Sequence, residues 1–168
     1  MIDVHETVFI GAGAVLTGDV TIGEGSSVWF NAVLRADLAP IRIGKNSAIE
    51  DHVVIHGGEA GVVEIADNVT VGHTAILHSC TIEDDALIGM GAIVMNRAYI
   101  GRGAVVGAGA VVLAGTEVPD GMLAVGNPAK VVKAVSPELT KSNAAGIASY
   151  LRFSKEQREG TADIYVGR

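Results

Sequence analysis

The sequence predicts an all-β fold, a parallel β-helix of hexapeptide repeats followed by one C-terminal α-helix. Three observations support this prediction: an aliphatic residue recurs every six positions, a small or aliphatic residue follows most of them four places later, and the period stops where helix signals begin. Triangular coils explain both columns, because each hexad forms one short face whose first and fifth residues point inward. The aliphatic column is Ile10, Leu16, Ile22, Val28, Leu34, Ile43, Ile49, Ile55, Ile65, Val71, Leu77, Ile82, Ile88, Val94, Ile100, Val106, Val112 and Val118.

The repeat also predicts the number and the hand of the coils. About seventeen hexads, taken three to a coil, give between five and six coils. Hexapeptide coils of this kind wind left-handed, against the right-handed preference of ordinary parallel crossovers. We take the left-handed winding over from the repeat class.

The pattern divides the chain into four segments. Residues 1–125 are expected to form the β-helix domain, 126–135 a turn and linker, 136–160 a helix packed on the prism, and 161–168 a mobile tail. Ser136 followed by Pro137 is typical of a helix N-cap and first position. The helix is expected to run to about Glu159, with Gly160 as its stop.

The six-residue period breaks at three places. It slips by three residues near Ala39 and Pro40, gains four between Ile55 and Ile65, and loses one between Leu77 and Ile82. Insertions in solenoids become loops on one face, often the binding face. The segment from Gly57 to Glu64 is therefore a candidate active-site loop.

Composition excludes several classes of protein. The chain has 168 residues, a net charge of −7 and no basic run, so we expect no nucleic-acid partner. No apolar run approaches the roughly 18 residues of a membrane helix, and Met1 to Thr7 lack the pattern of a signal peptide. The single Cys80 cannot form an internal disulfide, and is expected to be a small residue within a coil. A cytoplasmic protein without membrane association is the expected result.

Three histidines occupy related positions on the hexapeptide lattice. His56 and His78 are each second in their hexads and three hexads apart, so one should lie directly above the other, about 4.8 Å away. His73 is third in its hexad, near a corner, and should point away from this pair. Packing three prisms around a threefold axis would bring His73 of one chain against His56 and His78 of the next, predicting a metal site at each interface of a homotrimer.

Other polar and thioether side chains occupy equivalent lattice positions on the coils below and above the histidines. Arg35 should lie beneath His56 and Asp51 beneath His73, so that the same interface joins Arg35 to Asp51 of a neighbour as an ion pair. Met90 and Met95 occupy the corresponding positions above and would cover the site. The two remaining histidines, His5 and His52, are expected to be solvated or hydrogen-bonded surface residues.

From about Val8 to Tyr150, the sequence resembles the γ-class carbonic anhydrases. The resemblance implies a trimer of left-handed β-helices, each with a C-terminal helix. It also implies a metal between subunits, held by His56 and His78 of one chain and His73 of the next. The segments that carry the resemblance are Ser27-Val28-Trp29, Leu34-Arg35-Ala36-Asp37, Glu50 to His56, Val71-Gly72-His73, Leu77-His78 and Ile88 to Ala92.

The resemblance implies hydration of CO2 to bicarbonate, and three imidazoles with an open coordination position suit this reaction. A metal in such a site lowers the pKa of a bound water to about 7 and supplies hydroxide, and Zn²⁺, Fe²⁺ or Co²⁺ would suit the ligands. The resemblance further implies that Arg35 and Asp51 fix the interface and that Asp37 orders the bound water and bicarbonate. It implies that Tyr150 reaches the pocket from the helix.

Acidic residues matter in two ways: some could transfer protons, and others are gained or lost relative to the family. Glu59 or Glu64 in the inserted loop could relay protons to solvent. Family members commonly carry Asn, any residue, Gln and Asp before the first metal histidine, whereas this chain has Ala48-Ile49-Glu50-Asp51, with Glu50 in the place of Gln. Glu50 adds a carboxylate that could act as a base, repel bicarbonate or ligate the metal. Leu38 stands where the archetypal enzyme has an acid.

Two alternative functions remain open from the sequence. A trimeric scaffold subunit could keep the metal ligands but have lost the proton pathway. A CoA-dependent hexapeptide acyltransferase shares the fold and often has a turn like Gly126 to Lys130, but uses one histidine as a general base.

Overall fold

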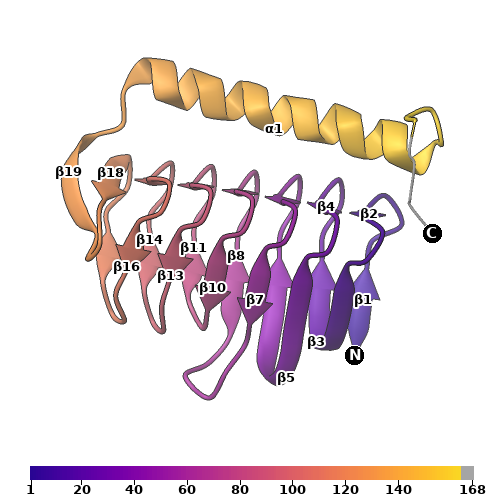
Figure 1. Cartoon of the computed structure of the whole chain (residues 1–168), viewed down its shortest axis with the longest axis horizontal. Coiled ribbons are helices and arrows are strands. Elements are labelled where there is room, and N and C mark those ends of the chain that lie inside the picture. Colours follow the sequence, from indigo (N-terminus) through magenta and orange to yellow (C-terminus); the bar gives the residue numbers. More distant parts are fainter. Residues whose placement is uncertain (164–168) are drawn as a thin grey trace.

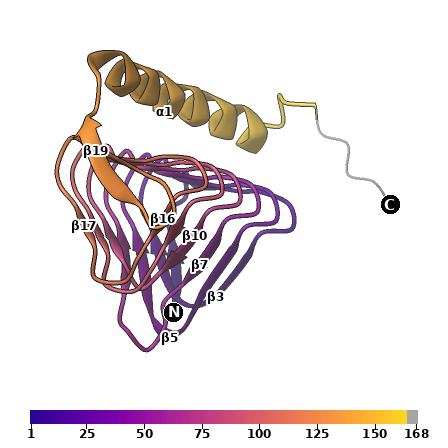
Figure 2. The same ribbon diagram turned by 60° about the vertical axis from the view of Figure 1, so that its left-hand side comes forward.

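The computed structural model describes residues 1–163, which form a prism of stacked coils with one helix along its side (Figure 1). An 11-stranded and an eight-stranded sheet make up the coils. Figure 2, a view nearer to the axis of the coils, shows their triangular outline and the helix lying along one edge. The expected tail at 161–168 falls largely on residues 164–168, which lie outside the described part of the chain.

All but one of the strand pairings are parallel, as a β-helix requires. The 11-stranded sheet contains β1 (Ile2–Val4), β3 (Val15–Ile22), β5 (Val33–Ile43), β7 (Val54–His56), β8 (Val63–Ile65), β10 (Ile76–His78), β11 (Thr81–Ile82), β13 (Ile93–Val94), β14 (Tyr99–Ile100), β16 (Val111–Val112) and β17 (Glu117–Val118). The eight-stranded sheet contains β2 (Phe9–Ile10), β4 (Ser27–Val28), β6 (Ala48–Ile49), β9 (Thr70–Val71), β12 (Leu87–Ile88), β15 (Val105–Val106), β18 (Met122–Val125) and β19 (Lys130–Ala134).

The prism has about seven coils, because seven parallel strands from β2 to β18 stack in the eight-stranded sheet. The sequence predicted between five and six coils, and this count was too low. Two hexads at the ends escaped it: Val4 aligns with Ile22, and Ala124 aligns with Val106. Both are in phase with the aliphatic column, but one lies beside the polar N-terminus and the other is only an alanine.

The core is the double column that the hexads predicted. Leu34, Ile55 and Leu77 are fully buried on successive coils, and so are the fifth-position alanines Ala32 and Ala75. Burial of these side chains is the main stabilising contribution to such a fold, at roughly 1.5 to 3 kcal/mol for each large aliphatic residue. Cys80 is 2% exposed and belongs to the same core, as expected.

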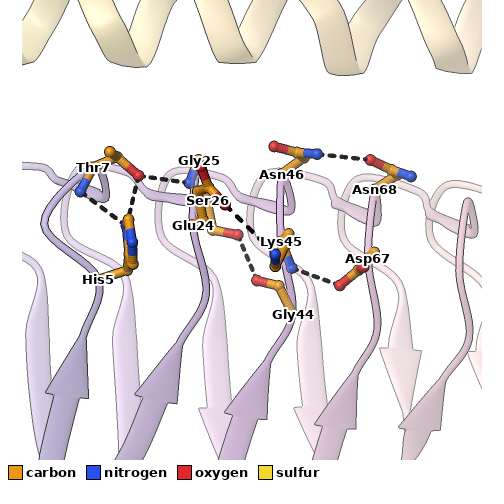
Figure 3. Close-up of polar contacts among 10 residues, drawn as sticks. All are labelled: His5, Thr7, Glu24, Gly25, Ser26, Gly44, Lys45, Asn46, Asp67 and Asn68. Carbon is orange, nitrogen blue, oxygen red and sulfur yellow. Dashed lines mark hydrogen bonds and ion pairs between the residues drawn. The ribbon is translucent and has the colours of Figure 1, made fainter.

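Polar side chains link successive coils at the corner beneath the helix (Figure 3). Thr7 Oγ1 accepts from Gly25 N at 2.9 Å, and Asn46 Nδ2 donates to Asn68 Oδ1 at 3.3 Å. Both asparagines have positive φ, 56° and 57°, a conformation that asparagine tolerates better than most residues. His5 Nδ1 lies 2.9 Å from Thr7 Oγ1, consistent with a hydrogen-bonded surface residue.

After the last coil the chain reverses direction and then forms the helix. The region predicted as a turn and linker contains β19, which pairs antiparallel with β18. The helix α1 (Pro137–Arg158) begins after Ser136, whose side chain accepts from Leu139 N. Its start and its stop near Glu159 agree with the sequence prediction.

Aromatic contacts fasten the C-terminal half of α1 to the first coils. The Tyr150 ring lies edge-on to Trp29 at 5.4 Å, and Trp29 in turn contacts Phe9 at 5.1 Å. Ile147 is buried on the same side of the helix. Within residues 1–163, no helix combines the length and the apolar character needed to cross a membrane.

Candidate metal centre

Two histidines lie one above the other on adjacent coils. β7 and β10 are parallel neighbours whose register aligns His56 with His78. Their ring centroids are 4.8 Å apart, and His56 Nδ1 lies 2.9 Å from His78 Nε2. Arg35 of β5 is aligned with His56 on the opposite side. The column of Arg35, His56 and His78 predicted from the six-residue spacing is therefore present.

His73 lies in the turn that follows β9, a strand of the other sheet. Its backbone N donates to Glu50 Oε2 at 2.9 Å, its Nε2 lies 3.1 Å from the same oxygen, and its Nδ1 lies 3.0 Å from Asp51 Oδ2. The side chain is 41% exposed. Within residues 1–163, no three His, Cys, Asp or Glu side chains of one chain form a group able to hold a metal. One chain thus brings together two of the three predicted ligands.

All three breaks in the six-residue period fall at one corner of the prism, directly after Arg35, His56 and His78. β5 has three more residues than β3 between the aligned pairs Gly18/Ala36 and Val20/Ile41. The larger insertion, residues 57–62, projects as a loop between β7 and β8 (Figure 1). Ala39 N donates to Gly57 O at 3.0 Å and joins the two insertions. The coils are therefore irregular at this corner, next to the histidine pair.

The first insertion carries Asp37 to the histidine pair. Asp37 Oδ1 lies 2.9 Å from His56 Nε2, and Asp37 Oδ2 accepts from Arg35 Nη1 at 2.6 Å. The Arg35 guanidinium, and to a smaller extent His56, holds the pKa of the Asp37 carboxyl below its usual value. Arg35 thus pairs with Asp37 inside one chain, and its pairing with Asp51 of a neighbour stays a prediction.

Glu50 lies beneath the turn that carries His73. Its side chain is only 7% exposed, whereas that of Asp51 is 33% exposed. The Tyr150 hydroxyl is half-buried near these two carboxylates, and burial, followed by Glu50 and Asp51, raises the pKa of Tyr150 above its ordinary value. A buried carboxylate, a backbone N–H and a phenol therefore lie together behind His73.

The acidic residues predicted as proton relays and the methionines predicted to cover the site lie in different parts of the prism surface. The Glu59 side chain is exposed in the loop and makes no ion pair or side-chain hydrogen bond with the rest of residues 1–163. Glu64 belongs to β8 on the next face, aligned with Arg42 and Thr81. Leu38, Met90 and Met95 are exposed by 62%, 58% and 39%. Burial raises the pKa of the Cys80 thiol to about 12, so this core side chain is protonated at neutral pH.

Sequence reasoning missed two residues that contact His78. Asn96, in the turn after β13, places Oδ1 2.5 Å from His78 Nδ1. Gly58 lies so close to the ring that a Cβ added there would be 2.5 Å from His78 Cε1. The only signal in the sequence was that Asn96 comes one hexad position after Met95, which the lattice places above His78.

The two stacked imidazoles have the surroundings typical of metal-ligating histidines. The His56 and His78 rings face each other through unlike nitrogens, and each ring has a second polar partner on its far nitrogen, Asp37 or Asn96. Metal-ligating histidines almost always have such a partner, which fixes the tautomer and the ring orientation. The third imidazole that a closed His₃ set requires would have to come from another chain.

The chain matches the family described as "Bacterial transferase hexapeptide (six repeats)" at residues 2–36 and 79–114. A structure of a hexapeptide transferase family protein from Anaplasma phagocytophilum is 36% identical, with a TM-score of 0.88 and coverage of 92% of this chain and 91% of that one. The fold and these matches define the chain as a hexapeptide-repeat protein with a parallel β-helix.

Within that class, the chain is similar to proteins named as carbonic anhydrases. It is 45% identical over 161 residues to "Carbonic anhydrase" of Geobacillus kaustophilus, covering 92% of this chain and 88% of that one. It is 40% identical over 141 residues to "Gamma carbonic anhydrase 2, mitochondrial" of Arabidopsis thaliana, where it spans about half of the relative's length, 51%. The chain belongs to the γ-class carbonic anhydrase family.

Proposed function

We propose that this protein catalyses the reversible hydration of CO2 to bicarbonate at a metal shared between subunits of a homotrimer. The observation that carries the proposal is the pair His56 and His78, stacked in register on adjacent coils, with the third histidine exposed on the neighbouring sheet. Relatives at 40% and 45% identity that are named as carbonic anhydrases support the same activity.

The donor set suits Zn²⁺, and Fe²⁺ or Co²⁺ would be held by the same imidazoles. A metal bound by three histidines with one open position lowers the pKa of a bound water to about 7 and so supplies the hydroxide that CO2 requires. In this proposal His56 and His78 bind the metal from one chain and His73 binds it from the next. Glu50 holds the backbone of the turn that carries His73.

Exposed aliphatic residues beside the histidines support the homotrimer. Val54 and Ile76, two positions before His56 and His78 on the same strands, are 39% and 40% exposed. They belong to a continuous outward column, and a column of this kind exposed on a monomer is typical of an interaction surface. A second copy of the chain also supplies what the site lacks, a third imidazole. The column consists of Val15, Val33, Val54, Ile76, Ile93 and Val111.

The remaining polar residues have roles that follow from their positions. Asp37 Oδ2 accepts from Arg35 Nη1 and Oδ1 pairs with His56 Nε2, and this carboxylate would orient the water and bicarbonate next to the histidine pair. On assembly, Arg35 would exchange part of its contact with Asp37 for Asp51 of a neighbour. Tyr150 would donate a hydrogen bond from its hydroxyl behind the pocket, beside Glu50; a tyrosine is protonated at neutral pH, and the raised pKa of Tyr150 extends this to higher pH.

Proton release requires a group that contacts solvent. Glu59 is exposed on the loop whose Gly58 contacts the His78 ring. We assign the relay to Glu59 rather than to Glu64, because Glu64 lies on the next face of the prism.

The test is CO2 hydration by stopped flow on protein purified anaerobically with Zn²⁺ or Fe²⁺ supplied. We expect turnover that is lost in His73→Ala, together with about one metal per chain in the wild type and little in the variant. Bound metal without turnover would instead identify a metal-binding scaffold. In that case Glu50→Gln should leave the rate unchanged, whereas a gain in rate would identify an enzyme slowed by this carboxylate.

The acyltransferase alternative is tested on the same preparations. A thermal shift with acyl-CoA in metal-free protein, unchanged by His73→Ala, would favour that class over a carbonic anhydrase. Nothing in the histidine stack requires a CoA ligand, because an acyltransferase of this fold needs only one histidine as a general base.

A further inference from the structure

The His78 imidazole is held on two sides within its own chain. Its Nδ1 is 2.5 Å from the amide oxygen of Asn96, one coil above. Its other nitrogen, Nε2, lies 2.9 Å from His56 Nδ1. The two ring nitrogens therefore have different partners, and only Nε2 faces the proposed metal position.

An amide oxygen can accept a hydrogen bond but cannot donate one. The contact with Asn96 Oδ1 is therefore favourable only when His78 Nδ1 carries the proton. In a neutral imidazole the other nitrogen is then the one with a free lone pair. Asn96 thus selects the tautomer in which Nε2 of His78 is ready to bind a metal.

The Asn96 side chain starts from a fixed backbone. Its carbonyl oxygen accepts from Gly115 N at 2.9 Å on the next coil, and its residue is half-buried. The ring it holds is also confined from the opposite direction, because a Cβ at Gly58 would lie 2.5 Å from Cε1 and 3.0 Å from Nε2. Gly58 itself is fixed, since its N donates to the buried Ser79 Oγ at 3.0 Å. The ring is therefore confined between two anchored neighbours.

We propose that Asn96 is a positioning residue that fixes His78 as its Nδ1-protonated tautomer and so presents Nε2 to the metal. This inference rests on the proposed function in one respect, that a metal binds at His56 and His78. It adds a residue outside the predicted ligand set. Loss of such a partner typically lowers metal affinity by about 10-fold to 100-fold.

The first measurement uses the metal-free protein, so that it does not depend on activity. Long-range ¹H–¹⁵N correlation of the histidine rings, above the ordinary imidazole pKa of about 6.5, reports which nitrogen of His78 is protonated. We expect protonated Nδ1 in the wild type and in Asn96→Asp, which keeps an accepting oxygen. We expect a mixture of tautomers in Asn96→Ala.

The second measurement is Zn²⁺ affinity by competition with a chelator. Asn96→Ala should bind about 10-fold to 100-fold more weakly than wild type, whereas Asn96→Asp should recover at least wild-type affinity. Asn143→Ala is the matched control, because it also removes one asparagine hydrogen bond, the 2.9 Å contact of Nδ2 with Asp85 O, far along α1. The control should leave both tautomer and affinity unchanged.

Two results would overturn the proposal: an unprotonated Nδ1 on His78 of the wild type, or an Asn96→Ala protein with unchanged tautomer and unchanged Zn²⁺ affinity. Failure of the proposed function has a different signature. In that case the wild type binds Zn²⁺ with the expected tautomer but hydrates no CO2.

Discussion

The two carboxylates that contact His73 differ in a way that separates their roles. Glu50 is nearly buried, and its Oε2 is held by the backbone N–H of His73. Asp51 is more exposed and is held by Phe30 N at 3.1 Å through its other oxygen. Moving Glu50 would leave the part-buried His73 N–H without this partner, at a cost of up to about 1 to 3 kcal/mol. Asp51 keeps Phe30 N on Oδ1 while its more exposed side chain leaves Oδ2 accessible, so in the proposed trimer Asp51 rather than Glu50 is the carboxylate that would meet Arg35 of a neighbour.

The placement of Glu50 predicts how Tyr150 titrates. Burial, Glu50 and Asp51 all raise the pKa of the Tyr150 phenol. In Glu50→Gln a negative charge is removed while the burial remains, so this pKa should fall but stay above its ordinary value of about 10. Tyrosinate absorbance followed against pH measures it, after subtraction of the Tyr150→Phe curve. An unchanged titration in Glu50→Gln would contradict the assigned proximity.

The raised pKa of Tyr150 also predicts how the free energy of unfolding changes at high pH. The folded pKa of Tyr150 exceeds the unfolded value, so the unfolded chain loses this proton first as pH rises. The free energy of unfolding should therefore decline from about pH 10 up to the folded pKa. Tyr150→Phe should show a shallower decline than the wild type over the same range.

Residues on the regular lattice could be predicted from the sequence, and residues at the irregular corner could not. The stack of His56 on His78 follows from counting hexads, because each lies second in its hexad. Asp37 lies in the three-residue insertion, whose path the lattice does not define, so its contact with His56 was not predicted; the family resemblance implied only a role toward bound water and bicarbonate. Asn96 escaped notice because an asparagine in a turn is ordinarily a turn former.

At the scale of elements, the loop of residues 57–62 contacts the site through its backbone. Gly57 and Gly58 are both buried, with Gly57 packed on Ala39 and Pro40 of β5 and Gly58 packed on the His78 ring. The sequence indicated Gly57 to Glu64 as a candidate active-site loop because it interrupts the six-residue period. The structure adds that the loop also limits the space available to a proposed ligand.

Gly58→Ala should weaken metal binding without unfolding the protein. The new Cβ would clash with His78 Cε1, which is the far end of a side chain and can move, so the ring should turn away from Asn96. We expect a loss of Zn²⁺ affinity of about 10-fold or more, measured by chelator competition, and a nearly unchanged thermal unfolding midpoint.

Gly146→Ala is the control for that substitution. A Cβ at Gly146 meets nothing within 4 Å in the helix, so the variant should gain roughly 0.5 to 1 kcal/mol of stability from helix propensity and keep its metal affinity. Equal affinities in the two variants would show that Gly58 does not confine the ring.

At the scale of the whole molecule, the repeat that made the fold predictable also places a column of aliphatic side chains on the outer surface. Alternation along the hexads specifies which residues fill the core, so the coils follow from the sequence. The same alternation places Val54 and Ile76 outward beside the histidines, where one chain leaves them exposed. Counting hexads underestimated the number of coils, because Val4 and Ala124 at the ends of the column were not recognised.

A shared site predicts that two defective chains can repair each other. His56→Ala and His73→Ala should each bind little metal alone, since every interface of either trimer lacks one imidazole. When the two are co-expressed, a His73→Ala chain still supplies His56 and His78, and a His56→Ala neighbour still supplies His73. Random assembly should then restore about a quarter of the sites, measured as metal content per chain after purification of the mixed trimer.

Co-expression of His56→Ala with His78→Ala is the matched control. These two residues come from the same column of the same chain, so no arrangement of subunits reunites them. The control should therefore recover no metal. Equal recovery in the two mixtures, or none in either, would contradict a site divided between His56 and His78 of one chain and His73 of the next. Recovery only in the first mixture would establish that division without reference to catalytic rate, and would hold for a scaffold as well as for an enzyme.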